Sequence, residues 1–245
     1  MERIKYLHTY TREQLIGMCE TALNNPEFGP IRFYAETFIK SEDKTKDGEE
    51  FRTEVIAGFV LKNLDVFNNG IPIITRGNYK MSHDGHLTDT NQVEKNTAKK
   101  LFNLSKEKGL SFPYIGVVED YETPLNDRNG QGAGAIDVLS VNREESTVYI
   151  LELKKDGSPE TMLRCVLEAY TYLKTVDRIN LFKSFDIPEH YDLKAAPLVF
   201  KRGLPWEQMQ EIDKHPNLKK LMDELKVYPF FISGPIEGMY EISKE

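Results

Sequence analysis

Cysteine is scarce in this 245-residue chain, which has only Cys19 and Cys165. Neither belongs to a CxxC pair, and no histidine has the spacing that would complete a zinc site with them. A structural zinc centre therefore has no support. Cys165 lies at helical spacing between Met162 and Ala169, so we interpret it as a small core residue, and no neighbouring base indicates a thiol nucleophile.

Long apolar runs are also missing. The longest is VIAGFVL at 55–61, whereas about 20 apolar residues are needed to cross a bilayer. This argues against an integral membrane protein. The amino-terminal sequence MERIKYLHTYTREQL has no apolar segment followed by a small-residue cleavage site, so we expect a cytoplasmic protein.

The chain has no excess of positive charge, because 32 Lys and Arg against 39 Asp and Glu give a formal net charge of −7. Phosphate binding depends on local clusters of Lys and Arg rather than on this sum, so a nucleic-acid partner is not excluded. Hydrophobic residues make up 40% of the chain, with 13 Phe and 12 Tyr. That supply is enough for the packed core of one domain or two small ones.

Periodicity and capping residues predict a mixed α/β order. The run KSEDKTKDGEE at 40–50 has almost no apolar side chain, so it is the best candidate for a linker, with a boundary near 45. This predicts an N-terminal extension at 1–50 and a domain at 51–245. Residues 31–39 fit a strand or a helix. Helices are predicted at 11–23, 49–64, 92–108 (ended by Gly109), from an N-cap at Ser158 with Pro159 to about 175, and at 206–225; strands are predicted at 114–121, 134–141, 147–153, near 198 and near 230.

The central pair of strands can be placed in register. If Asp137 faces Glu152, then Val141 faces Val148, and a short polar loop, REES, joins the strands. Because side chains alternate along a strand, Asp137 and Glu152 share an otherwise apolar face, and Lys154 joins them opposite Ala135.

Two carboxylates placed opposite each other on paired strands repel, and each raises the pKa of the other. A hard cation such as Mg²⁺ or Mn²⁺ would compensate Asp137 and Glu152, and Lys154 would add a positive donor for a phosphate.

The segment IDVLSVNREESTVYILELKK resembles the PD-(D/E)xK nuclease superfamily. Asp137 matches the first acid and Glu152, Leu153 and Lys154 match the ExK element, while Ile136 stands in place of the name-giving proline. The resemblance covers about 114–175. It implies a restriction-endonuclease-like core at about 90–235, with a central mixed β-sheet flanked by helices.

In the RecB-like and Mrr-like branches, the helix after the ExK element often bears Gln or Glu with Tyr four residues later, which Glu168 and Tyr172 resemble. The helix before the first strand often bears a Glu; Glu94 is the best candidate, and Glu54 is a rival. By this resemblance, Asp137, Glu152 and the Leu153 carbonyl would hold the metal, and Lys154 would orient water or stabilise the oxyanion.

The implied function is metal-dependent phosphodiester hydrolysis of nucleic acid by a DNA nuclease, endo or exo, with RNA not excluded. The alternative is an inactive nucleic-acid-binding or assembly module on the same core, and a third hypothesis is a metal phosphohydrolase that is not a nuclease. The oligomeric state is open, a homodimer included.

Several other features have ordinary structural interpretations beside their functional ones. The lysines of 92–108 could face DNA, but a solvated helix is favoured. Glu168 could simply pair with Arg164 one turn earlier. Glu94 could be an ordinary first-turn acid, and Tyr172 could be a core residue. Gly130, Gly132 and Gly134 are interpreted as a flexible loop rather than as a place where the backbone approaches a phosphate. His83 and His86 are weak evidence for a metal site.

Overall fold

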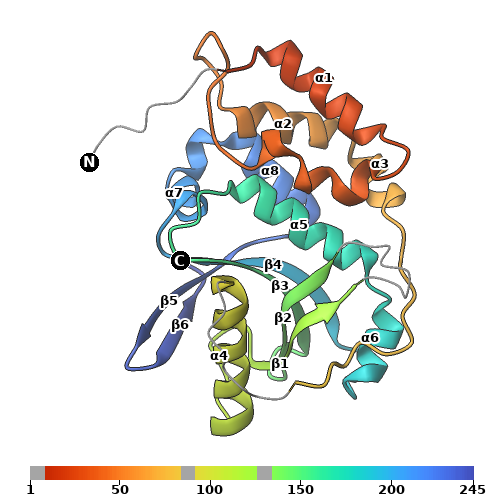
Figure 1. The fold of residues 1–245 in the computed structure, drawn as a ribbon, viewed down its shortest axis with the longest axis vertical. Helices are drawn as coiled ribbons and strands as arrows, with labels where there is room; N and C mark the ends of the chain where they lie inside the picture. Colours follow the sequence, from red (N-terminus) through yellow and green to blue (C-terminus); the bar gives the residue numbers. More distant parts are fainter. Residues whose placement is uncertain (1–8, 84–91, 126–133) are drawn as a thin grey trace.

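The computed structural model describes residues 9–83, 92–125 and 134–245. The chain is of the α/β type, as the sequence predicts, and Figure 1 shows its helices on both sides of a curled sheet. The α-helices are α1 (Arg12–Leu23), α2 (Arg52–Lys62), α3 (Leu64–Gly70), α4 (Val93–Lys108), α5 (Met162–Thr175), α6 (Arg178–Ser184), α7 (Leu204–Gln210) and α8 (Pro216–Leu225), with 3-10 helices at Gly29–Ala35, Thr37–Ile39 and Ile212–Lys214. The strands are β1 (Val117–Pro124), β2 (Ala135–Asn142), β3 (Thr147–Lys154), β4 (Asp192–Phe200), β5 (Phe230–Ile236) and β6 (Met239–Ser243).

The strands form one six-stranded mixed sheet in the order β1 to β6. β1, β2 and β3 are an antiparallel meander, which confirms the predicted one. β4 joins β3 in parallel after the crossover through α5, and β5 joins β4 in parallel after α7 and α8. The last strand, β6, returns antiparallel to β5 and was not predicted.

The register of the central hairpin is the predicted one. Val141 lies opposite Val148, and Leu139 lies opposite Ile150. These four side chains are buried in the core between the sheet and α5. The alternate residues of the same strands belong to a second core beneath α4. Because β3 is buried on both faces, its polar residues at the carboxyl end need partners.

Two of the differences from the predicted helices have a clear physical cause. α5 begins at Met162 rather than at Ser158 and Pro159, because Thr161 is the N-cap and its hydroxyl oxygen accepts from the Arg164 amide at 3.1 Å. The helix predicted at 206–225 is two helices, since the chain turns through a 3-10 segment and restarts with Pro216 at the first position of α8.

The segment at 40–50 is not the loose linker that its composition suggested. Asp43 and Thr45 are buried, and Lys44 forms a β-bridge with Phe51. Polar contacts order this segment in place of apolar burial. The region at 31–39, ambiguous in the sequence, forms the 3-10 helices. The division into 1–50 and 51–245 stays a prediction.

Within the described ranges, no helix has both the length and the apolar character that crossing a membrane requires.

Candidate active site

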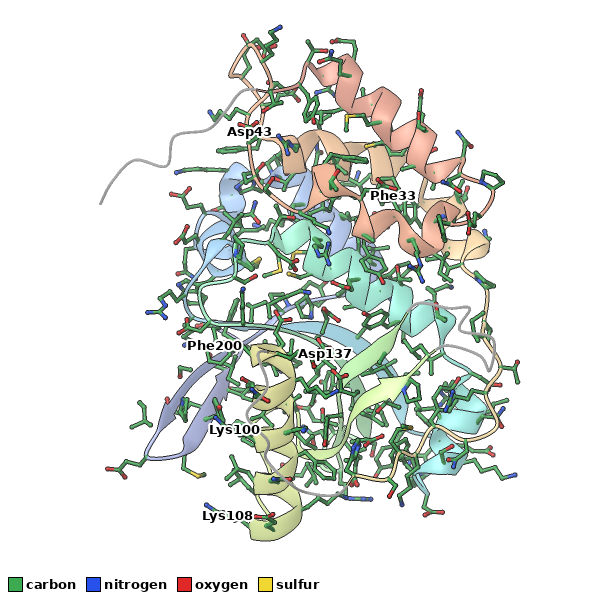
Figure 2. All side chains as sticks on the ribbon, viewed as in Figure 1. Phe33, Asp43, Lys100, Lys108, Asp137 and Phe200 are labelled. Carbon is green, nitrogen blue, oxygen red and sulfur yellow. The ribbon has the colours of Figure 1, made fainter. Side chains whose placement is uncertain are left out.

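The carboxyl end of β3 and the start of β2 bring the first predicted site residues together. The Leu153 amide donates to Asp137 Oδ2 at 2.8 Å, so the Asp137 carboxylate lies against the β3 backbone. The Lys154 amine lies 2.5 Å from Glu152 Oε1. Figure 2 shows Asp137 at the centre of the molecule, beside the upper part of α4. The hairpin register therefore assembles the acid, acid and lysine set.

α5 contributes the next pair, Glu168 and Tyr172. Glu168 Oε2 accepts from the Lys154 amine at 3.0 Å, and the Tyr172 hydroxyl donates to Glu168 Oε1 at 3.3 Å. Both residues are buried, and their spacing of one helical turn puts them on the face that meets the sheet. Glu168 thus contacts the site directly.

α4 brings Glu94 to the same end of the sheet. Its Oε1 accepts from the Lys155 amide at 3.0 Å, and its charge contributes to raising the pKa of Asp137. A cavity of about 360 Å³ opens between Glu94 and Asp137. The rival residue, Glu54, is engaged elsewhere: its carboxylate accepts from the backbone amides of Asn217 and Leu218 at the start of α8, at 2.9 and 3.0 Å.

Two further charged residues surround Lys154. Glu160 Oε2 lies 3.0 Å from the Lys154 amine and 3.0 Å from Arg164 Nε. Arg164 Nε also lies 3.6 Å from Glu168 Oε2, so the pairing considered from the sequence exists beside the contact with Lys154. The role of Glu160 was missed, although its spacing of four residues from Arg164 was the signal that could have found it.

Burial dominates the electrostatics of this cluster. It raises the pKa of Asp137 to about 7, although Lys154 and the Leu153 amide act in the opposite direction. It raises the pKa of Glu152 well above its usual range, and the charges of Asp137 and Glu168 add to that shift. Burial alone would lower the pKa of Lys154, but Glu152 and Glu168 raise it overall. The acids are therefore undercompensated and the lysine stays protonated.

The donor set fits a hard divalent cation. Among the described residues, Glu152 Oε2 is buried without a hydrogen-bond partner, and Asp137 lines the cavity that it shares with Glu94. Carboxylate oxygens are the ligands that Mg²⁺ prefers. Within the part of the chain that the structure describes, no three His, Cys, Asp or Glu side chains are already grouped to hold a metal. The site would therefore rest on two carboxylates, with backbone or water oxygens completing the shell.

The remaining candidates lie apart from this cluster or are packed into the core. His83 pairs with Asp120 and stacks on Tyr121 with ring centroids 3.9 Å apart, while its predicted companion His86 lies outside the described residues. Cys165 is fully buried, its thiol donates to the Thr161 carbonyl, and burial raises its pKa, all of which suits a core residue.

The glycine cluster before β2 is described only at Gly134, since Gly130 and Gly132 lie outside the described residues. Gly134 has a φ of 105°, and a Cβ there would lie 3.8 Å from the Tyr172 hydroxyl. Two of the α4 lysines, Lys95 and Lys106, pair with acids of β1 at 3.2 and 2.8 Å. This is the behaviour of a solvated helix face.

Comparison with known proteins adds no relative: the chain matches no family model, and neither a curated protein nor a solved structure matches it.

Proposed function

We propose that the chain is a metal-dependent nuclease acting on DNA, with a core of the restriction-endonuclease type. The observation that supports this best is the convergence of Asp137, Glu152 and Lys154 where β2 begins and β3 ends. Glu168 joins them there from α5. The order α4, β1 to β3, α5, β4 agrees with the core expected from the resemblance.

In this proposal Asp137, Glu152 and the Leu153 carbonyl hold Mg²⁺ or Mn²⁺. When bound, the ion activates water and neutralises charge on the phosphate that is attacked. Lys154 has the positive charge and the position to donate to a phosphate oxygen as negative charge develops. Glu168 and Glu160 hold that amine, and Tyr172 and Arg164 hold those acids in turn.

Glu94 has a positioning role in the proposal. Its contact with the Lys155 amide fixes the end of β3 next to the ExK residues. Its charge faces Asp137 across the small cavity, which favours a cation there.

The test is cleavage of linear, circular and single-stranded DNA by the purified protein in Mg²⁺ or Mn²⁺. We expect cleavage that EDTA abolishes and that falls on the order of 10²-fold or more in Glu152→Gln and Lys154→Ala. Circular dichroism checks that each variant is folded. Glu54→Gln is the matched control, because it alters a buried acid outside the cluster.

Cleavage that survives in folded Glu152→Gln would refute the site. DNA binding without cleavage, with an affinity that falls steeply with salt, would favour the binding-module alternative. Hydrolysis of small phosphate esters with no cleavage of DNA or RNA would favour a phosphohydrolase of another kind.

A further inference from the structure

A second cavity lies at the opposite end of the parallel strands from Lys154. It has a volume of about 630 Å³ and is lined by Tyr149 of β3, the start of β4 and the start of β5. Tyr149 pairs with Lys194 and Lys154 pairs with Val199 along the same ladder. At roughly 3.3 Å per residue, the two places are about 16 Å apart along the strands. The cavity is therefore separate from the candidate active site.

Lysines outnumber acids among the residues that line this cavity, and one further acid lies beside it, because the Tyr149 hydroxyl donates to Glu145 Oε2 at 3.3 Å. Lys194, Lys226 and Lys244 line it and are exposed. The acid among its lining residues, Asp223, accepts a hydrogen bond from the Tyr228 hydroxyl at 3.0 Å. Lys194 also has Asp192 at 3.9 Å. In a chain whose net charge is −7, this local excess of lysine favours an anionic ligand.

Aromatic rings form the walls. Phe230 packs edge-on against Tyr149 with centroids 5.2 Å apart, and Tyr228 is 51% exposed at the mouth. The row continues outward, because Tyr114 stacks against Phe230 at 6.5 Å and Lys244 lies over the Tyr114 ring at 4.8 Å. Such surfaces accept flat rings by stacking while lysines hold attached anions.

The backbone at Tyr114 is held in an unfavourable conformation. Its φ is 66°, in the left-handed region that a bulky residue rarely adopts, and its ring is 41% exposed. The Asn142 side-chain amide donates to the Tyr114 carbonyl at 2.8 Å and keeps this conformation. Tyr114 does not line the cavity itself, but its exposed ring extends the aromatic row beside Phe230.

We propose that this cavity binds one nucleoside phosphate unit, with the base against the exposed ring of Tyr228 and the phosphates among Lys194, Lys226 and Lys244. The volume suits a ligand of that size, since small-molecule sites are usually about 300–1,000 Å³. The site has both an aromatic ring and several lysines. A simple anion would leave the ring without a contact, and a simple apolar ligand would leave the lysines without one. The inference does not rest on the nuclease proposal.

The test is calorimetric titration of the full chain with ATP, adenosine and tripolyphosphate in EDTA, so that binding cannot pass through the candidate metal site. We expect saturable binding of ATP that is at least tenfold tighter than binding of either part alone. A parallel titration with an oligo(dT) 12-mer asks whether the unit is a free nucleotide or part of a single strand. ATP would bind more tightly in the first case and the oligonucleotide in the second.

Variants connect the binding to the cavity. Tyr228→Ala and the double change Lys194→Glu with Lys226→Glu each weaken binding at least tenfold, whereas Tyr228→Phe, which keeps the ring, binds as the parent does. Lys220→Glu is the matched control, because Lys220 is exposed on α8 and does not line this cavity. Equal affinity for tripolyphosphate and ATP, binding unchanged by Tyr228→Ala, or no saturable binding of any probe would overturn the proposal.

Discussion

Two ionic clusters, one around Arg52 and one around Lys154, use the same kinds of side chain. They differ in whether each carboxylate oxygen has a hydrogen-bond donor. In the first, Asp43 Oδ2 accepts from Arg52 Nη2 at 2.8 Å and from the Thr9 hydroxyl at 2.9 Å. Asp43 Oδ1 accepts from the Lys44 amide at 2.9 Å. Each carboxylate oxygen of Asp43 therefore has a donor.

The Lys154 cluster has more acid than it can satisfy. Glu152, Glu160 and Glu168 share Lys154 and Arg164, and Glu152 Oε2 is buried without a hydrogen-bond partner among the described residues. Asp137 and Glu152 both have raised pKa values, with burial as the main cause. Unsatisfied buried charge lowers stability, so its presence here points to a ligand that supplies the missing charge.

Burial alone does not separate the two clusters. Next to Asp43, burial also raises the pKa of Glu42, yet Glu42 accepts from the Thr53 and Asp43 amides and from Gln208. The complete set of donors, and not the direction of the pKa shift, marks the Arg52 cluster as structural.

The largest effect on stability should come from breaking the satisfied cluster. Arg52→Ala leaves Asp43 buried without its ion pair, which typically costs about 3–5 kcal/mol of unfolding free energy. Urea denaturation measures this loss, and Lys62→Ala, at an exposed position of the same helix, is the control. A loss no larger than that of the control would show that the Arg52 cluster does not hold the fold together.

Removing an acid from the Lys154 cluster should raise the unfolding free energy rather than lower it. In metal-free protein at pH 8, Asp137→Asn removes the charge of a partly buried carboxylate, while its side-chain oxygen can still accept from the Leu153 amide. We expect a gain of about 1–3 kcal/mol in unfolding free energy together with loss of cleavage. Asp192→Asn, at an exposed position, should change neither. Destabilisation by Asp137→Asn would contradict the comparison.

The raised pKa of Asp137 makes the unfolding free energy depend on pH. Because the pKa of Asp137 is about 7 when folded and near 4 when unfolded, the folded state binds more protons between these values. Its contribution to stability therefore falls as pH rises from about 4 to about 7 and is constant above that. The difference in unfolding free energy between parent and Asp137→Asn should follow this curve, and a difference that does not vary with pH would exclude it.

The smallest expected effects distinguish Glu54 from Glu94, the two candidates for the supporting glutamate. Glu54→Gln weakens the contacts that hold the start of α8, at a cost of about 1 kcal/mol, and leaves cleavage unchanged. Glu94→Gln should lower cleavage several-fold with little change in the melting temperature. If the two variants exchanged these results, Glu54 would be the supporting residue.

The sequence predicts which candidate residues lie together better than it predicts the fold around them. Alternation along 134–154 fixes which residues share a face, so the juxtaposition of Asp137, Glu152 and Lys154 follows from a single register. Glu168 and Tyr172 follow from helix spacing together with the resemblance. These are local relations, which a period and a turn determine.

Other features depend on tertiary contacts that no local pattern contains. Glu94 and Glu54 have similar settings in the sequence, and only the packing of α4 against β1 and of α2 against α8 separates them. The start of α5 at Thr161 depends on a hydroxyl that also donates to the distant Ile39 carbonyl. The segment at 40–50 is ordered by polar partners, which composition does not reveal.

Titration of metal-free protein with Mn²⁺, followed by electron paramagnetic resonance, addresses the central claim most directly. If Asp137 and Glu152 form a divalent-cation site, the parent and Glu54→Gln bind the ion saturably, Mg²⁺ competes for it, and Glu152→Gln does not bind it. Equal binding by the parent and Glu152→Gln, or no binding by the parent, would contradict the account.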